Sequence, residues 1–399
     1  MHLGIVTSHP IQYQAPLFRA LAERVDLTVY FAHRATGKNQ AEAGFDVGFD
    51  WDTDLTHGFR HTFLENLSRQ PSITRFAGCD TPSIGGVFAA DKVDVVAVYG
   101  WHFKSYLQAA RAGRRLGIPV MVRSDSHLAN PRPLVKRAVK AVVLPPLLRL
   151  FDMFLPTGTR SAQYLRRYRV PESRIRIVPY CIDVDTFASA AVRGRVERER
   201  LRREFGAAAG ESMVLFVGKL IALKEIPTII EALARLVGAG QAARLVVVGS
   251  GPLAGELTAM ANARSLPVTF AGFVNQTRMP EVYAAADVLV LPSSSETWGL
   301  VVNEAFACGL PAIVSDRVGC GPDMIVDGTT GSIVPVGNVE RLADAIGYWT
   351  GAHSKERPDP AATRLALGGV TARYSPASSA AAFIAAAESA AAADRKVKR

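Results

Sequence analysis

The feature that most constrains the fold of this chain is a repeated alternation between short apolar runs and stretches with helical spacing. Such alternation is typical of α/β domains with parallel sheets, because each buried strand is followed by a helix that covers it. The predicted strands are residues 3–7, 25–32, 93–100, 119–124, 152–157, 174–180, 212–218, 243–250, 267–273, 287–293 and 311–316.

The predicted strands form two sets, separated by a polar, alanine-rich stretch over 185–212 that lacks strand character. A chain of 399 residues is long enough for two domains with separate cores. We therefore predict two doubly wound, Rossmann-like domains and a C-terminal helix that packs back on the first. The predicted bounds are 1–190 for the N-terminal domain, 191–210 for a linker, 211–375 for the C-terminal domain and 376–399 for the helix.

The location of the protein and its need for a metal are predicted from what the sequence lacks. The N-terminus has no basic segment followed by a cleavage site, and no apolar run reaches the roughly 18 residues of a membrane span. We expect a cytoplasmic protein. The cysteines have no metal-ligand spacing, so we expect small, partly buried thiols and no disulfide framework, metal site or other cofactor. They are Cys79, Cys181, Cys308 and Cys320.

The positive charge is concentrated in one segment of the first domain. Residues 131–176 carry eleven basic and two acidic side chains, which is +9 of the net charge of +10. Such a segment attracts anions, but no nucleic-acid motif accompanies it, so we expect no nucleic-acid partner. Residues 133–151 have a basic and an apolar face at helical spacing, which suits peripheral contact with the inner membrane face. An ordinary helix packed on the sheet is an equal alternative.

Candidate binding residues follow the strands of the second domain, where ligands of doubly wound sheets bind. Lys219 comes directly after the strand 212–218 and Lys224 five residues later, so both could hold a diphosphate. Two solvated surface lysines are the alternative. Gly249 lies in a turn after the next strand, a weak signal on its own.

Two glutamates in the segment 293–309 lie eight positions apart. In a helix, Glu296 and Glu304 would be roughly 12 Å apart, which is too far for two carboxylates that flank one glycosidic bond, about 5–9.5 Å. The spacing suits the two ends of an elongated ligand such as a nucleotide sugar. The alternatives are a capping box formed by Ser293 and Glu296 and a solvated position for Glu304.

Several segments together resemble a known family. Residues 296–316 resemble the E-x7-E signature of the retaining glycosyltransferases of family 4, which have the GT-B fold of two Rossmann-like domains that face a central cleft. Residues 217–225 are similar to the G-R/K-L-x-x-x-K stretch of that family, and 268–296 to its run up to the signature. The first domain resembles a subset of the family more loosely.

The resemblance implies roles for particular residues. Lys219 and Lys224 would hold the donor diphosphate and stabilise the leaving group, Glu296 would contact the donor sugar and Glu304 the ribose. The other implied donor-binding residues, in the glycine turns, near the base and at the sugar or distal phosphate, are Gly218, Gly249, Gly272, Phe273, Trp298, Gly299 and Leu300.

The first domain departs from the family pattern at the places where an acceptor would bind. The loop after the first strand carries bulky residues in place of glycines, and we expect these residues on the acceptor side. They are His9, Gln12 and Tyr13. Asp125 takes the position of a histidine near the donor sugar, with His127 two residues later and His102 after the preceding strand. Which of the three acts at the sugar, and whether any does, stays open.

The resemblance thus implies a retaining, metal-independent glycosyltransferase. It would move a sugar from a nucleotide-diphosphate donor, most often UDP-linked in this family, to a hydroxyl acceptor that is anionic or lipid-linked. The product would be a glycan, a glycolipid or a glycosylated metabolite. Two alternatives are a nucleotide-sugar epimerase of the same fold and a non-catalytic partner subunit of a glycosyltransferase. The presence of both lysines and both glutamates argues against the second.

Overall fold

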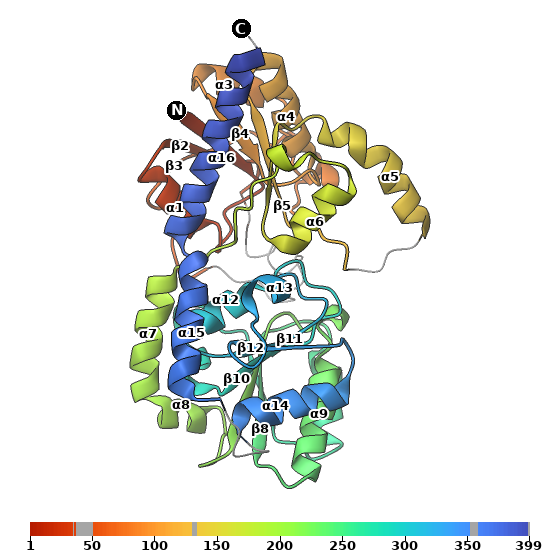
Figure 1. Ribbon diagram of the computed structural model, residues 1–399, viewed down its shortest axis with the longest axis vertical. Coiled ribbons are helices and arrows are strands. Elements are labelled where there is room, and N and C mark those ends of the chain that lie inside the picture. Colours follow the sequence, from red (N-terminus) through yellow and green to blue (C-terminus); the bar gives the residue numbers. More distant parts are fainter. Residues whose placement is uncertain (35, 37–50, 130–133, 352–357, 398–399) are drawn as a thin grey trace. The chain divides into compact units, whose positions relative to one another are not determined.

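The structure is a computed structural model (Figure 1), and it describes residues 1–34, 36, 51–129, 134–351 and 358–397. The chain divides into two compact units. Among the described residues, unit 1 contains 1–34, 36, 54–129, 134–181 and 376–397, and unit 2 contains 51–53, 182–351 and 358–375.

Each unit is built on a six-stranded parallel sheet, and both sheets have the same strand order. The order is β3-β2-β1-β4-β5-β6 in unit 1 and β12-β11-β10-β7-β8-β9 in unit 2, so in both sheets the first and fourth strands in chain order are neighbours. The predicted α/β class with two Rossmann-like domains is confirmed, whereas the central cleft stays a prediction. The strands are β1 (His2–Thr7), β2 (Asp26–Phe31), β3 (Arg60–Phe63), β4 (Val95–Val98), β5 (Val120–Ser124), β6 (Met153–Pro156), β7 (Ser212–Val217), β8 (Ala243–Val248), β9 (Val268–Gly272), β10 (Val288–Leu291), β11 (Ala312–Ser315) and β12 (Gly331–Val334).

The strands that the sequence did not predict lie at sheet edges. β3 and β12 are each four residues long and only partly buried, so they lack the continuous apolar run of a central strand. The predicted strand 174–180 is wrong. Those residues run beside the edge strand β6, where Arg176 and Val178 donate backbone hydrogen bonds to it, but only one isolated bridge forms, between Phe154 and Ile175.

Helices cover the sheets of both units, and several begin at side-chain caps. Asp183, Asn338 and Asp359 each accept a backbone N–H in the first turn of the helix that follows, as expected of cap residues. The helices are α1 (Ala15–Ala22), α3 (Ile84–Ala90), α4 (Lys104–Leu116), α5 (Leu134–Leu148), α6 (Thr159–Arg167), α7 (Val184–Val196), α8 (Arg198–Glu204), α9 (Ile226–Gly238), α10 (Ala254–Asn262), α11 (Met279–Ala285), α12 (Leu300–Ala307), α13 (Gly321–Met324), α14 (Val339–Thr350), α15 (Pro360–Arg373) and α16 (Pro376–Val397).

The predicted boundary at residue 190 and the predicted linker over 191–210 are wrong. Unit 2 begins at Ile182, and most of 191–210 is helical, in α7 and α8. Both helices pack against α11. The alanines and arginines that made the stretch look like a linker are the small and polar side chains of helices on the surface of unit 2.

The C-terminal helix α16 belongs to unit 1. It packs against α1 and against β4, β5 and β6. Its inner side chains are at most 2% exposed and join the core of unit 1; they are Ala380, Phe383, Ala386, Ala387 and Ala390. Within the part of the chain that the structure describes, no helix combines the length and apolar character that crossing a bilayer requires.

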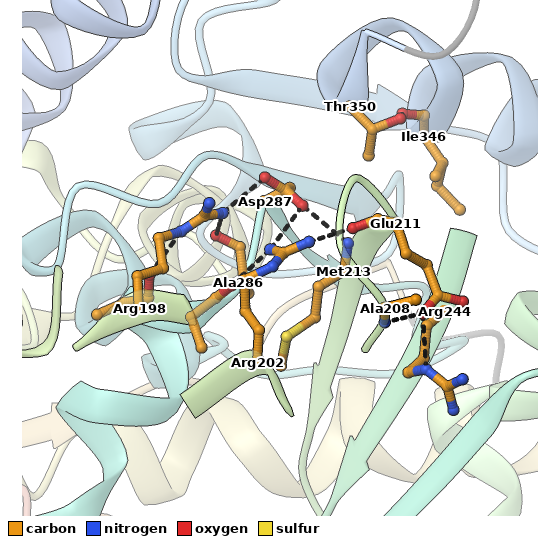
Figure 2. A network of polar contacts seen from close by, with 12 residues as sticks. Arg198, Arg202, Ala208, Glu211, Met213, Arg244, Ala286, Asp287, Ile346 and Thr350 are labelled. Atoms are coloured by element: carbon orange, nitrogen blue, oxygen red, sulfur yellow. Dashed lines mark hydrogen bonds and ion pairs between the residues drawn. The ribbon is translucent and has the colours of Figure 1, made fainter. Parts of the chain in front are cut away.

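A polar network fastens α8 to the sheet of unit 2, and Figure 2 shows its members. The Asp287 carboxylate, directly before β10, accepts from Arg198 at 2.7 Å, from Arg202 at 3.1 Å and from the Met213 backbone N–H at 2.8 Å. Arg202 is buried and also donates to the Ala285 carbonyl at 2.9 Å. The network therefore joins α8 to β7 and β10, the two central strands whose opposite ends carry the predicted donor residues.

Candidate active site

The loops after β7 and β10 bring two of the predicted donor residues together. β7 and β10 are neighbours at the point where the strand order of the sheet reverses, which is where ligands of doubly wound sheets bind. Lys224 donates a hydrogen bond to the Glu296 carboxylate, and both side chains are only 17% exposed. An ammonium has three N–H donors and a carboxylate two oxygens, so each group keeps capacity for a ligand.

Lys219 lies beside this pair. Its side chain is half-buried, and its pKa is lowered below the usual value, first by burial and then by the nearby positive charge of Lys224, while Glu296 acts in the opposite direction. Lys219, Lys224 and Glu296 therefore share one electrostatic site. Two positive charges held together out of bulk water favour an anionic ligand.

Glycines let the loops after β7 and β8 approach each other at backbone distance. Gly218 and Gly249 have φ of +154° and +135°, and a Cβ placed on Gly249 would lie 1.9 Å from the Gly218 carbonyl oxygen. The Leu220 N–H donates a hydrogen bond to the Ser250 carbonyl at 2.9 Å. The Gly249 N–H donates one to the Gly272 carbonyl at 2.8 Å. Gly218, Gly249 and Gly272 thus form one layer at the carboxyl ends of β7, β8 and β9, with Phe273 next in the chain.

The segment before α12 is fixed in place without a capping box. α12 begins at Leu300, and its N-cap is Gly299 with φ of +100°, so the proposed box of Ser293 and Glu296 is wrong. The Trp298 ring is buried, and its Nε1 donates to Asn303 Oδ1 at 2.9 Å. The backbone N–H groups of Gly319 and Cys320 donate to the carbonyls of Glu296 and Trp298 at 3.0 and 2.9 Å, and the Glu296 side chain contacts Lys224, so this loop lies beside that lysine.

Glu304 is not a solvated helix residue. It is 8% exposed, and its Oε2 accepts a hydrogen bond of 2.6 Å from the Tyr283 hydroxyl on α11. Burial raises the pKa of Glu304 from its usual 4.5 to about 7, although the hydrogen bonds from Tyr283 and Gln276 act in the opposite direction. A buried carboxyl whose protonation changes near neutral pH is a typical feature of functional sites.

In unit 1 the predicted acceptor residues gather at the ends of β1, β4 and β5. The Tyr13 ring packs edge-on against Tyr180, with centroids 5.2 Å apart, and the Tyr180 hydroxyl lies 3.3 Å from Asp125 Oδ2. The charge of Asp125 influences the pKa of both tyrosines and of His102. Burial is the largest influence on each, raising the tyrosine pKa values and lowering that of His102. The structure therefore brings Asp125 and His102 into one group.

The remaining predicted residues of unit 1 take different positions. His127 is buried in its own loop, where its Nδ1 accepts the Ala129 N–H at 3.2 Å. His9 is also buried, 2.9 Å from the Ser8 hydroxyl, and burial together with His33 lowers its pKa to about 4, so it is neutral at pH 7. Gln12 lies half-buried in the turn before α1.

Two residues of the site regions were missed from the sequence. Tyr283 lies in a segment that the resemblance already covered, but nothing in its spacing pairs it with Glu304. Arg123 is buried between Tyr99 and Tyr180 and donates to the carbonyls of Val178 and Pro179. Arg123 lies among the apolar residues of strand β5, so the sequence pattern did not mark it as a site residue. All four cysteines are buried, more fully than predicted, and none forms a disulfide. Among the described residues no three His, Cys, Asp or Glu side chains are grouped as a metal site needs.

Two protein-family models match the chain. The model described as "Glycosyl transferase 4-like domain" matches residues 10–181, and that described as "Glycosyl transferases group 1" matches 197–357. The two matched regions correspond closely to unit 1 without its C-terminal helix and to most of unit 2.

Curated proteins with similar sequences include several sugar transferases. A D-inositol 3-phosphate glycosyltransferase of Mycobacteroides abscessus is 31% identical, over 66% of this chain and 61% of its own length. A GDP-mannose-dependent alpha-mannosyltransferase of Mycobacterium tuberculosis is 34% identical, over 64% of each chain. The match thus spans about three fifths of the length of these relatives.

Solved structures share the fold across the whole chain. HepE of Anabaena in complex with UDP has a TM-score of 0.73 at 17% identity, covering 96% of this chain and 98% of its own. A sucrose-phosphate synthase of Thermosynechococcus elongatus has a TM-score of 0.67 at 20% identity, covering 100% and 99%.

Proposed function

The chain belongs to family 4 of the glycosyltransferases, which have the GT-B fold, and from this premise we propose that it transfers a sugar from a nucleotide-diphosphate donor to a hydroxyl acceptor. The observation that carries the proposal is the contact between Lys224 and Glu296 beside Lys219, at the point where the strand order of unit 2 reverses. The donor in this proposal is a UDP-sugar, which the family resemblance and the UDP complex of a structural neighbour support.

The proposed chemistry needs positive charge where the leaving diphosphate develops negative charge. Lys219 and Lys224 would supply it without a metal ion, since fixed charges in a partly buried site stabilise a transition state strongly. Glu296 would accept hydrogen bonds from the donor sugar. In a reaction with retention, the acceptor hydroxyl would attack from the side of the leaving phosphate, which would help to take its proton.

A thermal-shift screen of the purified protein tests the donor site. We expect one of UDP, GDP, ADP, CMP and dTDP to stabilise the wild type, by about 2.7 kcal/mol at 100 times its dissociation constant. Lys224→Ala should lose this stabilisation, because the variant lacks one of the diphosphate contacts. If no nucleotide stabilises the wild type, the donor-site proposal is wrong and a non-catalytic partner subunit becomes the better reading.

An epimerase would bind the same donor, so it is distinguished by its products. Incubation of the nucleotide sugar with the enzyme alone should leave the sugar unchanged under our proposal. Conversion to an epimer without any acceptor would favour the epimerase.

We propose that the acceptor is a molecule at an anionic lipid surface, because helix α5 of unit 1 has an exposed apolar face that suits binding to such a surface. Val135, Val139, Val142 and Val143 recur at the spacing of one helix face and are 56–75% exposed. On the other side of the helix, Leu144 and Leu148 are buried in the core of unit 1. The segment 131–176 around this face carries +9, and basic residues beside an exposed apolar face suit binding to anionic lipid.

Vesicle co-sedimentation tests this surface. We expect the wild type to bind phosphatidylcholine vesicles that contain phosphatidylserine more strongly than vesicles of phosphatidylcholine alone. Val139→Asp with Val142→Asp should weaken binding about tenfold or more, because two charged groups would have to enter the apolar part of the interface. Val196→Asp, on an exposed helix position of unit 2, is the matched control and should bind like the wild type. Equal binding to both lipids, or none, would contradict the proposal.

A further inference from the structure

The side chain of Tyr283 is buried, and its hydroxyl donates a hydrogen bond to the Glu304 carboxylate. The side chain is 1% exposed, and its hydroxyl donates to Glu304 Oε2 at 2.6 Å. The short distance is typical of a hydrogen bond to an ionised carboxylate. Tyr283 lies on α11 and Glu304 on α12, so the contact joins two helices that pack against each other.

The surroundings of this pair contain few other groups that could set the charge of Glu304. Gln276 forms a second side-chain hydrogen bond that lowers its pKa. Cys308, one turn further along α12, has a pKa raised well above its usual value by burial and stays a neutral thiol, with Arg195 on α7 as its nearest positive influence. Burial raises the pKa of Tyr283 well above 10, so its hydroxyl keeps its proton and remains a donor.

The protonation of Glu304 matters for the ligand that our proposed function assigns to it. An ionised carboxylate accepts hydrogen bonds through both oxygens, whereas a protonated one has lost part of this capacity. A ribose offers two neighbouring hydroxyl donors. The hydrogen bonds from Tyr283 and Gln276 use two of the roughly four lone-pair positions of the Glu304 carboxylate, and the others can accept from these hydroxyls.

We propose that Tyr283 is a positioning residue for the donor: its hydroxyl favours the ionised form of the Glu304 carboxylate and orients it for the ribose of the nucleoside diphosphate. The inference rests on the proposed function, because it takes Glu304 as the ribose ligand. It assigns a role in nucleotide affinity to a residue that does not itself contact the nucleotide.

Calorimetric titration with UDP over a pH series tests the role. At about pH 7 we expect Tyr283→Phe to bind UDP about fivefold more weakly than the wild type, because loss of the hydrogen bond raises the pKa of Glu304 by about one unit, which lowers its ionised fraction at that pH about fivefold. The ratio of the two dissociation constants should fall toward one at about pH 9, where Glu304 is ionised in both proteins. Taking the ratio at each pH removes the titration of the nucleotide itself.

Two further variants make the result specific. Glu304→Gln cannot ionise, so it should bind UDP weakly at every pH, and adding Tyr283→Phe to it should cause little further loss. Tyr348→Phe, a half-buried hydroxyl of unit 2 on α14, is the matched control and should bind like the wild type.

The possible failures are distinguishable. Equal affinity of Tyr283→Phe and the wild type at every pH would overturn the positioning role and leave the proposed function standing. A loss that is the same at every pH would show that the hydroxyl only supports the packing of α11, and would also overturn it. Failure of the wild type to bind UDP, or undiminished binding by Lys224→Ala, would refute the UDP-site proposal itself.

Discussion

Lys224→Ala should lower the turnover number for sugar transfer by about 10²–10³-fold, because one preorganised positive charge at the leaving group is worth that much in comparable sites. In the structure Lys224 contacts Glu296 and lies close enough to Lys219 to lower its pKa. The variant therefore removes a charge from the diphosphate and a partner from the residue that would hold the donor sugar. The loss of the charge and the loss of the partner of Glu296 both affect the same step, the transfer of the sugar.

Release of the nucleoside diphosphate from the donor, followed at saturating donor and acceptor, measures this effect. Arg264→Ala is the matched control: it also removes a positive charge from unit 2, but from an exposed pair with Glu231, and should keep the wild-type rate. A Lys224→Ala enzyme that retains more than about a tenth of the wild-type rate would exclude the lysine from the reaction, since the expected loss is far larger.

Asp287→Ala should lower the free energy of unfolding of unit 2 by about 3–5 kcal/mol, because removing one partner of a buried ion pair leaves the other charge uncompensated. Asp287 accepts from Arg198, Arg202 and a β7 backbone N–H, and Arg202 is 6% exposed (Figure 2). Without the carboxylate, the Arg202 guanidinium would remain buried among backbone carbonyls alone.

Urea unfolding followed by tryptophan fluorescence checks this value. Trp298 and Trp349 are buried in unit 2, and Trp51 is assigned to it as well. A Trp101→Phe background therefore removes the tryptophan of unit 1 and confines the signal to unit 2. Glu231→Ala breaks an ion pair whose side chains are 36% and 45% exposed and should cost less than about 1 kcal/mol. An Asp287→Ala variant as stable as this control would show that the network does not carry the stability of unit 2.

The alternation of apolar runs was sufficient to predict both parallel sheets, because central strands are buried on both faces and leave continuous apolar runs. The edge strands β3 and β12 were missed for the converse reason: each is short and only partly buried. The stretch 191–210 was misjudged as a linker because its helices bury only small parts of their surface, such as Ala191, Gly194 and Leu201. These residues are buried by contact with α11, and such a contact cannot be predicted locally because α11 lies far away in the sequence.

The predicted donor residues were found through local rules and the family resemblance, since Lys219, Lys224 and Glu296 all follow central strands. Their direct contact could be anticipated only from the strand order, which places β7 beside β10. The contacts that Tyr283 and Asp287 make could not be predicted from the sequence. Their partners, Glu304 and Arg202, lie 21 and 85 positions away, and no local pattern encodes such pairs.

The position of α16 also sets the order in which the two units can mature during protein synthesis. A ribosome releases β1 to β6 first, but the core of unit 1 includes Ala380, Phe383 and Ala386, which are made after the main body of unit 2. The main body of unit 2 is one continuous segment, 182–375, and is complete before that helix appears. The core of unit 1 therefore stays incomplete until α16 has been made, and the apolar surface that α16 covers stays exposed, available to chaperones, until then.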